Sequence, residues 1–170
     1  MREYKFKTEP FDHQRRALQD SWAADYYALF MEMGTGKSKV AIDTMGVLYK
    51  AKKVGAALIL APKGVYDNWV QGLKIFVMNI EALSTPRGTK AAYAFLCKNP
   101  ANIMIVDEST TIKNRKATRT KNVMMLAKEA KYKRILTGSP VTKSPMDLFS
   151  QCAFLSSDAL GFNSYYSFQS

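Results

Sequence analysis

Five short apolar runs, each followed by a segment with helical periodicity, constrain the fold of this 170-residue chain more than any other feature. The runs are Tyr27–Met31, Ala57–Ala61, Lys74–Met78, Ile103–Val106 and Arg134–Leu136. They are nearly continuous rather than alternating, which is typical of strands covered on both faces. Strands that alternate with helices are joined by right-handed crossovers into a parallel sheet. The sequence therefore predicts a single α/β domain over residues 1–170, built on a doubly wound parallel sheet.

The segments between the runs carry apolar residues on one helical face. Two such faces are formed by Val40, Ala41, Thr44 and Leu48, and by Val123, Leu126, Ala127 and Ala130. Further along, Ser144 and Pro145 precede Asp147, and this pattern predicts a helix start with Ser144 as the cap and Pro145 in the first turn.

The join between the second and third strands is too short for an ordinary crossover. Only Pro62–Gly72 separates them, and a return to a parallel strand usually takes about a dozen residues or more. A helix over Val65–Gln71 would be about 10 Å long, whereas a five-residue strand is about 17 Å long. Our hypothesis is that residues are missing near positions 71–72, where the sequence would splice across a loop.

Composition bounds the compartment and the partners. No apolar run approaches the roughly 18–20 residues that cross a bilayer, and the charged N-terminus lacks the apolar core of a signal peptide. We expect Cys97 and Cys152 to be buried, reduced thiols, and the single histidine, His13, excludes a structural zinc site. These features predict an intracellular protein without a membrane partner. The net charge of +11 suits a polyanionic partner, but charge alone does not separate DNA from RNA or from a solvated surface.

A phosphate-binding loop is predicted where Met-Glu-Met-Gly-Thr-Gly-Lys-Ser follows the first apolar run and opens an amphipathic helix. Gly34 and Gly36 permit backbone conformations closed to other residues, so that successive N–H groups converge on phosphate oxygens. The dipole at the start of the helix favours the same negative charge. Lys37 is expected to reach the β- and γ-phosphates, and the Ser38 hydroxyl to be a Mg²⁺ ligand.

Two carboxylates, Asp107 and Glu108, follow the fourth strand. The carboxyl end of a parallel strand is where a doubly wound sheet binds its ligands. Asp107 fits the role of holding Mg²⁺, directly or through water, and Glu108 that of orienting and deprotonating the attacking water. A solvated acidic turn is the alternative for an isolated Asp-Glu pair; the upstream phosphate loop favours the catalytic interpretation.

Together these segments resemble the Swi/Snf-type family of superfamily 2 ATPases, and more narrowly its compact members from phages and bacteria. The segments that carry the resemblance are Phe11–Gln14, Met33–Ser38, Leu60–Lys63 with Asn68 and Trp69, Asn79–Leu83, Asp107–Thr110 with Lys113 and Asn114, Leu136–Pro140, and Asp147–Phe149. They follow one another in the order of the family's motifs and span about residues 10 to 155.

The resemblance implies a RecA-like P-loop NTPase lobe that uses ATP and Mg²⁺, in the cytoplasm of a bacterium or of a phage-infected host cell. The nucleotide-binding residues that it implies are Gln14 for the adenine, with Met33, Gly34, Thr35, Gly36, Lys37 and Ser38. It places Lys63, Trp69 and Asn79 on the nucleic-acid side, and assigns coupling roles to Thr110, Thr137, Gly138 and Ser139. Thr110 stands where many relatives have histidine, and His13 where an aromatic is commoner. Phe11 is a candidate for stacking on the adenine, with core packing as the alternative.

The resemblance also implies partners. Family members pair this lobe with a second RecA-like lobe that carries arginines for the γ-phosphate, so we expect the 170-residue chain alone to bind ATP weakly and to hydrolyse it very slowly. The expected track is double-stranded DNA, bound independently of sequence. The basic stretch Lys113–Lys121 either lines this track or forms a solvated helix start. An RNA helicase lobe, which the trailing Lys113 and Asn114 disfavour, and a non-catalytic, nucleotide-gated docking module are the competing interpretations.

Overall fold

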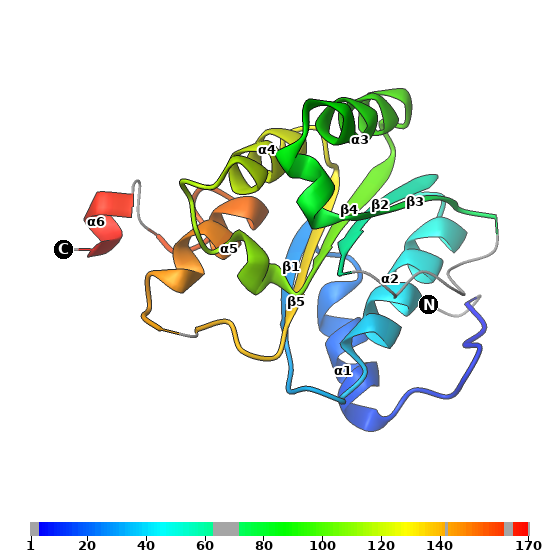
Figure 1. Cartoon of the computed structure of the whole chain (residues 1–170). Helices are drawn as coiled ribbons and strands as arrows, with labels where there is room; N and C mark the ends of the chain where they lie inside the picture. The colour runs from blue at the N-terminus through cyan, green and yellow to red at the C-terminus, as the bar shows by residue number, and fades with distance from the viewer. Residues whose placement is uncertain (1–3, 63–71, 142, 162–164, 170) are drawn as a thin grey trace.

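Five parallel strands form one sheet in the order β1-β5-β4-β2-β3 (Figure 1). The computed structural model describes residues 4–62, 72–141, 143–161 and 165–169. The strands are β1 (Tyr26–Phe30), β2 (Ala56–Ala61), β3 (Lys74–Asn79), β4 (Asn102–Asp107) and β5 (Tyr132–Thr137). Each coincides within two residues with one of the five apolar runs, and the predicted doubly wound α/β fold is confirmed.

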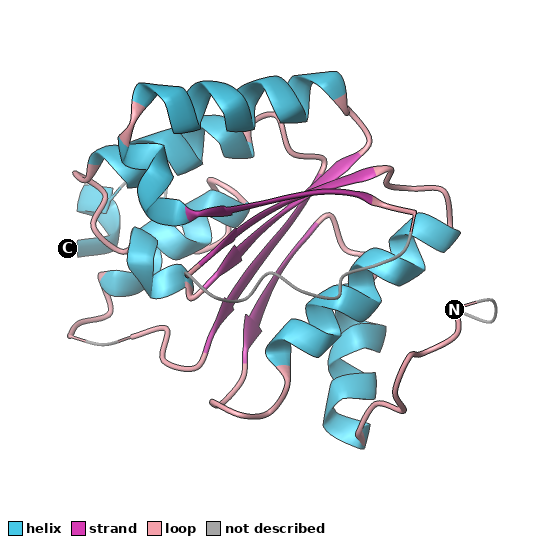
Figure 2. Ribbon diagram, turned by 45° about the vertical axis from the view of Figure 1, so that its right-hand side comes forward, coloured by secondary structure: helices cyan, strands magenta, loops and turns pink. Residues whose placement is uncertain are grey.

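Helices cover both faces of the sheet (Figure 2). On one face lie α1 (Asp12–Ser21) and α2 (Lys37–Lys50), and on the other lie α3 (Pro86–Lys98), α4 (Thr118–Ala127) and α5 (Asp147–Leu155). Two 3₁₀ turns, η1 (Ile80–Ser84) and η2 (Ser109–Ile112), follow β3 and β4 directly, and α6 (Tyr165–Gln169) is the last described element. Among the described residues, no helix is both long and apolar enough to cross a bilayer.

The central strands explain why their sequences are apolar without alternation. All six residues of β2 are buried. Ala57 and Ile59 belong to the core beneath α1 and α2. The intervening Leu58 and Leu60 belong to the core beneath α3, α4 and α5. Successive side chains point to opposite faces of a strand, and both faces here are covered by helices, so every position is apolar.

Two sequence-based predictions about this framework are wrong. The last long helix begins at Asp147 rather than at Pro145: the Asp147 N–H donates to the Ser144 carbonyl at 3.0 Å, and no side chain caps the helix. Of the two cysteines, Cys152 is buried but Cys97 is exposed, because it lies on the outer side of α3. The proposed splice at positions 71–72 is still a hypothesis, since residues 63–71 lie outside the described part of the chain.

Candidate nucleotide-binding and hydrolysis site

The segments that the sequence singled out meet at one edge of the sheet. Strand β5 lies between β1 and β4, and all three are parallel. Phe30 is opposite Thr137 in one ladder, and Asp107 is opposite Leu136 in the other. The phosphate loop, the loop after β5 and the two acids therefore leave the sheet side by side, from the edge where parallel sheets bind ligands.

The phosphate loop has the backbone that its glycines predict. Gly34 and Gly36 have φ angles of 78° and 84°, in the left-handed region where side chains are strained. Gly36 is the N-cap of the 14-residue helix α2, and no side chain caps the helix. The first amides of α2 and the helix dipole are thus directed at the space that a phosphate would occupy.

Lys37 is buried at this helix start, with 8% of its surface exposed. Its Nζ donates to the carbonyl oxygens of Met31 and Glu32, at 3.0 Å each. Both carbonyls belong to the phosphate loop itself. A bound phosphate would therefore compete for the ammonium group without any change in the surrounding core.

The opening motif is bonded to the tip of the phosphate loop. Gln14 is buried, and its Nε2 donates to the Thr35 carbonyl at 2.9 Å, while its Oε1 accepts from the Phe11 N–H at 3.1 Å. The His13 ring lies within 2.9 Å of the same Thr35 carbonyl. A Cβ on Gly36 would lie 2.4 Å from Gln14 Nε2, so this contact requires glycine. The structure thus brings Gln14 to the loop; its recognition of adenine is still a prediction.

Phe11 does not pack in the core, and that alternative was wrong. Its side chain is 70% exposed and stacks on the ring of His13, with centroids 5.9 Å apart and an interplanar angle of 15°. Met33, in the phosphate loop, is 82% exposed. An aromatic pair and a thioether therefore stand in solvent at the loop, where a nucleobase could cover them.

The acids occupy the predicted strand end. Burial raises the pKa of Asp107 above its ordinary value, while the Glu108 N–H, 3.0 Å from Asp107 Oδ1, and the nearby charge of Lys37 act to lower it. The charge of Lys37 acts on Asp107, which is consistent with the lysine and the acid lying at the same edge of the sheet. Glu108 has φ 51° and ψ 59°, a left-handed conformation that is uncommon for a residue with a side chain.

The loop after β5 packs against the phosphate loop. The Thr137 carbonyl accepts from the Met31 N–H at 3.3 Å, and Thr137 Oγ1 accepts from the Ser139 N–H at 3.2 Å. A Cβ on Gly138 would come within 3.0 Å of Met33 Cγ. The loop after β5, with Thr137, Gly138 and Ser139, thus contacts the phosphate loop, so a movement of one loop would displace the other. The coupling roles of these residues are still predictions.

A buried link between the acids and the loop after β5 was missed. Ser109 Oγ donates to Gln151 Oε1 at 2.6 Å, and Gln151 Nε2 donates to the carbonyls of Pro140 and Asp147 at 2.7 and 2.8 Å. Ser109 and Gln151 have no exposed surface. The signal in the sequence is a glutamine on the core face of an apolar helix. The coupling role of Thr110 is still a prediction, whereas the side-chain bridge between these loops runs through Gln151.

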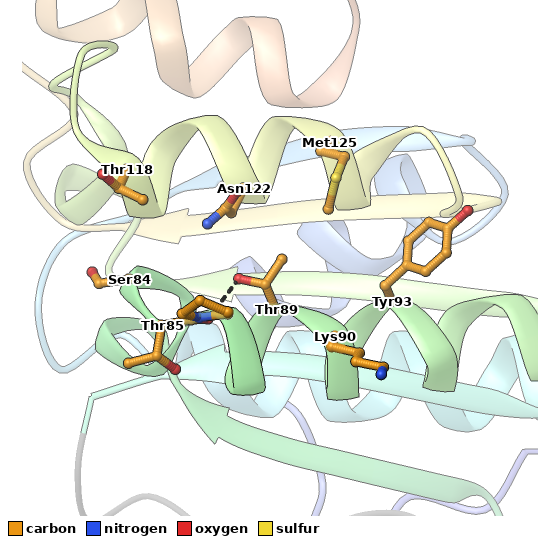
Figure 3. Close-up of a pocket in the computed structure, with 9 residues that line it drawn as sticks. Ser84, Thr85, Thr89, Lys90, Tyr93, Thr118, Asn122 and Met125 are labelled. Atoms are coloured by element: carbon orange, nitrogen blue, oxygen red, sulfur yellow. Dashed lines mark hydrogen bonds between the residues drawn. The ribbon is translucent and has the colours of Figure 1, made fainter.

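On the side predicted for nucleic acid, η1 follows β3. Asn79 caps η1, with its Oδ1 accepting from the Glu81 N–H at 2.9 Å. A groove of about 440 Å³ begins at the end of η1 and runs between α3 and α4 (Figure 3). Its lining is Ser84, Thr85, Pro86, Thr89, Lys90, Tyr93, Thr118, Asn122 and Met125. The other residues predicted for this side, Lys63 and Trp69, lie outside the described residues.

Two arginines of the basic stretch Lys113–Lys121 contact other parts of the chain, so the stretch is not a purely solvated helix start. The Arg115 guanidinium stacks over the ring of Tyr165, 4.0 Å from its centroid. Arg119 donates to the Glu81 carboxylate at 2.5 Å and to the Thr111 carbonyl at 3.1 Å. Arg115 and Arg119 thus have partners within the chain, and the lining of a DNA track by this stretch is still a prediction.

The fold and this site define a P-loop nucleotide-binding lobe with RecA-like topology. Residues 88–170 match the family model described as SNF2-related domain. A curated relative from Arabidopsis thaliana, named probable ATP-dependent DNA helicase CHR23, is 30% identical in an alignment 164 positions long, which covers 81% of this chain and 15% of the relative. The human DNA annealing helicase and endonuclease ZRANB3 is 26% identical in an alignment 145 positions long, which covers 71% of this chain and 13% of that protein.

Among solved structures, the SWI2/SNF2 ATPase core of Sulfolobus solfataricus in complex with dsDNA has a TM-score of 0.76 at 22% identity, covering 98% of this chain and 39% of that one. The same core without DNA has a TM-score of 0.70 at 20% identity, with 99% and 40% covered. The chain thus carries an SNF2-related domain over residues 88–170, and it spans about a seventh of the length of the curated relatives named above.

Proposed function

We propose that this chain is the ATP-binding lobe of a DNA-dependent ATPase, which couples ATP hydrolysis to movement along duplex DNA. The observation that carries the proposal is the convergence of Lys37 and the two acids at one sheet edge. The relatives' names, which include an ATP-dependent DNA helicase and an ATPase core in complex with dsDNA, support the same activity and track.

In this proposal the chain's own groups perform separate tasks. The amides from Gly34 to Ser38 cradle the phosphates, and Lys37 exchanges its loop carbonyls for phosphate oxygens. Gln14 and the exposed Phe11 face the adenine. Glu108 orients a water molecule towards the γ-phosphate and takes its proton.

A magnesium ion fits the oxygen donors at this edge. Mg²⁺ prefers one or two carboxylates together with substrate phosphates and water, and the Asp107 carboxylate and Ser38 hydroxyl are donors of this kind. When bound, the ion neutralises the charge that develops on the phosphate oxygens. Asp107 and Ser38 would hold it.

A second RecA-like lobe is part of the proposal. Arginines supplied from another element raise hydrolysis by about 10³–10⁵-fold in related NTPases. We therefore expect residues 1–170 alone to bind ATP weakly and to turn it over very slowly.

The test compares ATP hydrolysis by the full-length natural protein without nucleic acid and with single-stranded DNA, duplex DNA or duplex RNA. We expect duplex DNA to stimulate most. Glu108→Gln is the control, which should bind nucleotide and lose turnover by about 10²–10⁴-fold. Stronger stimulation by duplex RNA would favour an RNA helicase lobe, and nucleotide binding without turnover under any condition would favour a docking module.

A further inference from the structure

One side chain joins the two 3₁₀ turns that follow separate strands of the sheet. Arg119, in the first turns of α4, donates through Nε to the Thr111 carbonyl of η2 at 3.1 Å, and through Nη1 to the Glu81 carboxylate of η1 at 2.5 Å. Turn η1 belongs to the side predicted for nucleic acid, and η2 begins at the residue after Glu108. Arg119 therefore bridges the two functional sides of the lobe.

On the hydrolysis side, the path from Arg119 to Glu108 is short. Thr111 Oγ1 and the Thr111 N–H both donate to the Glu108 carbonyl, each at 3.0 Å. Glu108 itself is in a left-handed conformation. Such a backbone holds only while its neighbours fix it, so a shift of Thr111 would change the direction of the Glu108 carboxylate.

On the other side, α4 also holds the far end of η1. Asn122, one helical turn after Arg119, donates to the Leu83 carbonyl at 2.7 Å (Figure 3 shows Asn122 above the groove). Helix α4 thus contacts η1 at both Glu81 and Leu83. A displacement of η1 would be transmitted to α4 rather than absorbed between them.

The ion pair at the centre of this bridge is accessible. The Glu81 side chain is 58% exposed and that of Arg119 is 31% exposed. An exposed pair contributes only about 0–1 kcal/mol to stability, so it rearranges readily. A phosphate of bound nucleic acid at η1 would repel the carboxylate and compete for the guanidinium. The Arg119–Glu81 ion pair is therefore suited to open and close on nucleic-acid binding rather than to hold α4 and η1 rigidly together.

We propose that Arg119 is a positioning residue that transmits the binding of duplex DNA at η1 to the general base Glu108, and so sets how strongly DNA stimulates ATP hydrolysis. The inference rests on the proposed function, because it describes how the same site is regulated. It also changes the role of Arg119 from a cation of the DNA track to a link behind it.

The test uses the full-length natural protein with Arg119→Met, which keeps the aliphatic stem, and with Glu81→Gln, which keeps an acceptor but removes the charge. Lys128→Met, at the other end of α4, is the control for the lost positive charge, since Lys128 is exposed and outside the bridge. The measurements are turnover without DNA, turnover at saturating DNA, the DNA concentration for half-stimulation, and the KM for ATP.

We expect Arg119→Met and Glu81→Gln each to reduce the ratio of stimulated to unstimulated turnover by about 10-fold, with the KM for ATP within about twofold of wild type. The double variant should be no worse than the more affected single variant, because both changes break one link. Lys128→Met should keep the wild-type ratio.

Three outcomes would overturn the link. Full stimulation of Arg119→Met at a higher DNA concentration would make Arg119 a simple phosphate ligand. An equal loss of unstimulated and stimulated turnover would make its role structural. An unchanged ratio in Glu81→Gln would exclude the route through η1. A wild-type protein that no nucleic acid stimulates would instead refute the proposed function, and the link with it.

Discussion

Two cations are buried among the described residues, one towards each end of the sheet, and they are held in different ways. Lys37 lies at the carboxyl edge, where its ammonium group has the carbonyls of its own loop as partners. Arg134, in β5, has no exposed surface and reaches the connection between α1 and β1 at the opposite edge. Its guanidinium donates to the carbonyls of Ser21, Ala24, Asp25 and Lys133, at 2.7 to 3.3 Å.

The difference shows what separates a binding cation from a structural one. Burial lowers the pKa of Arg134 to about 10, while the charge of Asp25 acts in the opposite direction. The arginine stays charged at neutral pH and its acceptors belong to the closed interior. The acceptors of Lys37 stand at the open edge, where a phosphate can replace them. Two buried cations therefore have opposite roles, according to whether their partners can be exchanged.

Arg134→Met is the most damaging change for this comparison. It removes the guanidinium donor from four carbonyls of the α1–β1 connection and β5, of which those of Ser21 and Asp25 keep a backbone donor. Each buried acceptor that loses its partner costs about 1–3 kcal/mol, and we expect the free energy of unfolding, measured with urea, to fall by about 3–5 kcal/mol. Lys131→Met, an exposed neighbour, should unfold like wild type. A loss below about 1 kcal/mol would show that the two cations are equivalent in stability.

Lys37→Met should have the opposite effects: a small change in stability and a large loss of ATP turnover. The carbonyls it releases lie beside solvent, so the free energy of unfolding should change by no more than about 1 kcal/mol. Turnover of ATP by the full-length natural protein should fall by about 10²–10³-fold, the usual effect of removing one donor from a developing charge. A large loss of stability together with normal turnover would reverse the assignment of roles.

Gln151 sharpens the comparison, because it is a buried polar side chain with fixed partners at the functional edge. Gln151→Leu leaves the Ser109 hydroxyl and the Pro140 carbonyl unpaired, so unfolding should become easier by about 1–3 kcal/mol. Turnover should also fall by about 10-fold with an unchanged KM for ATP, since the segment after Glu108 loses its anchor. Ser109→Ala, which removes a single hydroxyl, should have a smaller effect on both measurements. Normal turnover in a folded Gln151→Leu protein would contradict the link.

Asp107→Asn should produce the smallest change, and a favourable one. Burial raises the pKa of Asp107, so the folded protein binds this proton more tightly than the unfolded chain, and the ionised carboxylate reduces stability. The variant should therefore unfold at a higher temperature at neutral pH, by roughly 2–4 °C if the gain is about 1 kcal/mol. The stability difference between Asp107→Asn and wild type should disappear as the pH falls below 3.8, the ordinary pKa of an aspartate, because the carboxyl is then protonated in both the folded and the unfolded state. Thermal scans at several pH values test this, and an advantage that persists in acid would exclude Asp107 as its cause.

The sequence predicted the sheet and the phosphate loop because both depend on local patterns. Apolar runs without alternation require cover on both faces, and the left-handed angles of Gly34 and Gly36 follow from residue type. The parallel order β1-β5-β4 then brings the acids to the loop, as the strand-end argument anticipated.

What the sequence could not predict depends on long-range side-chain pairing. Gln151 meets Ser109 across 42 positions, Arg119 meets Glu81 across 38, and Arg134 meets Ser21 across 113. A pattern of neighbours contains no information about such pairs. The exposure of Phe11 and the start of the helix at Asp147 were predicted wrongly for a related reason. Tertiary contacts decide which apolar side chains are buried and at which residue a helix begins.

The backbone at Glu108 has an evolutionary consequence. A left-handed residue that is not glycine carries about 1–2 kcal/mol of strain, so exchange for glycine relieves strain and removes the carboxylate at once. Selection for heat resistance alone would favour that exchange. A laboratory screen for stability that does not require activity would therefore select variants that no longer hydrolyse ATP. A glutamate that persists at this position across natural populations would record continued selection for hydrolysis.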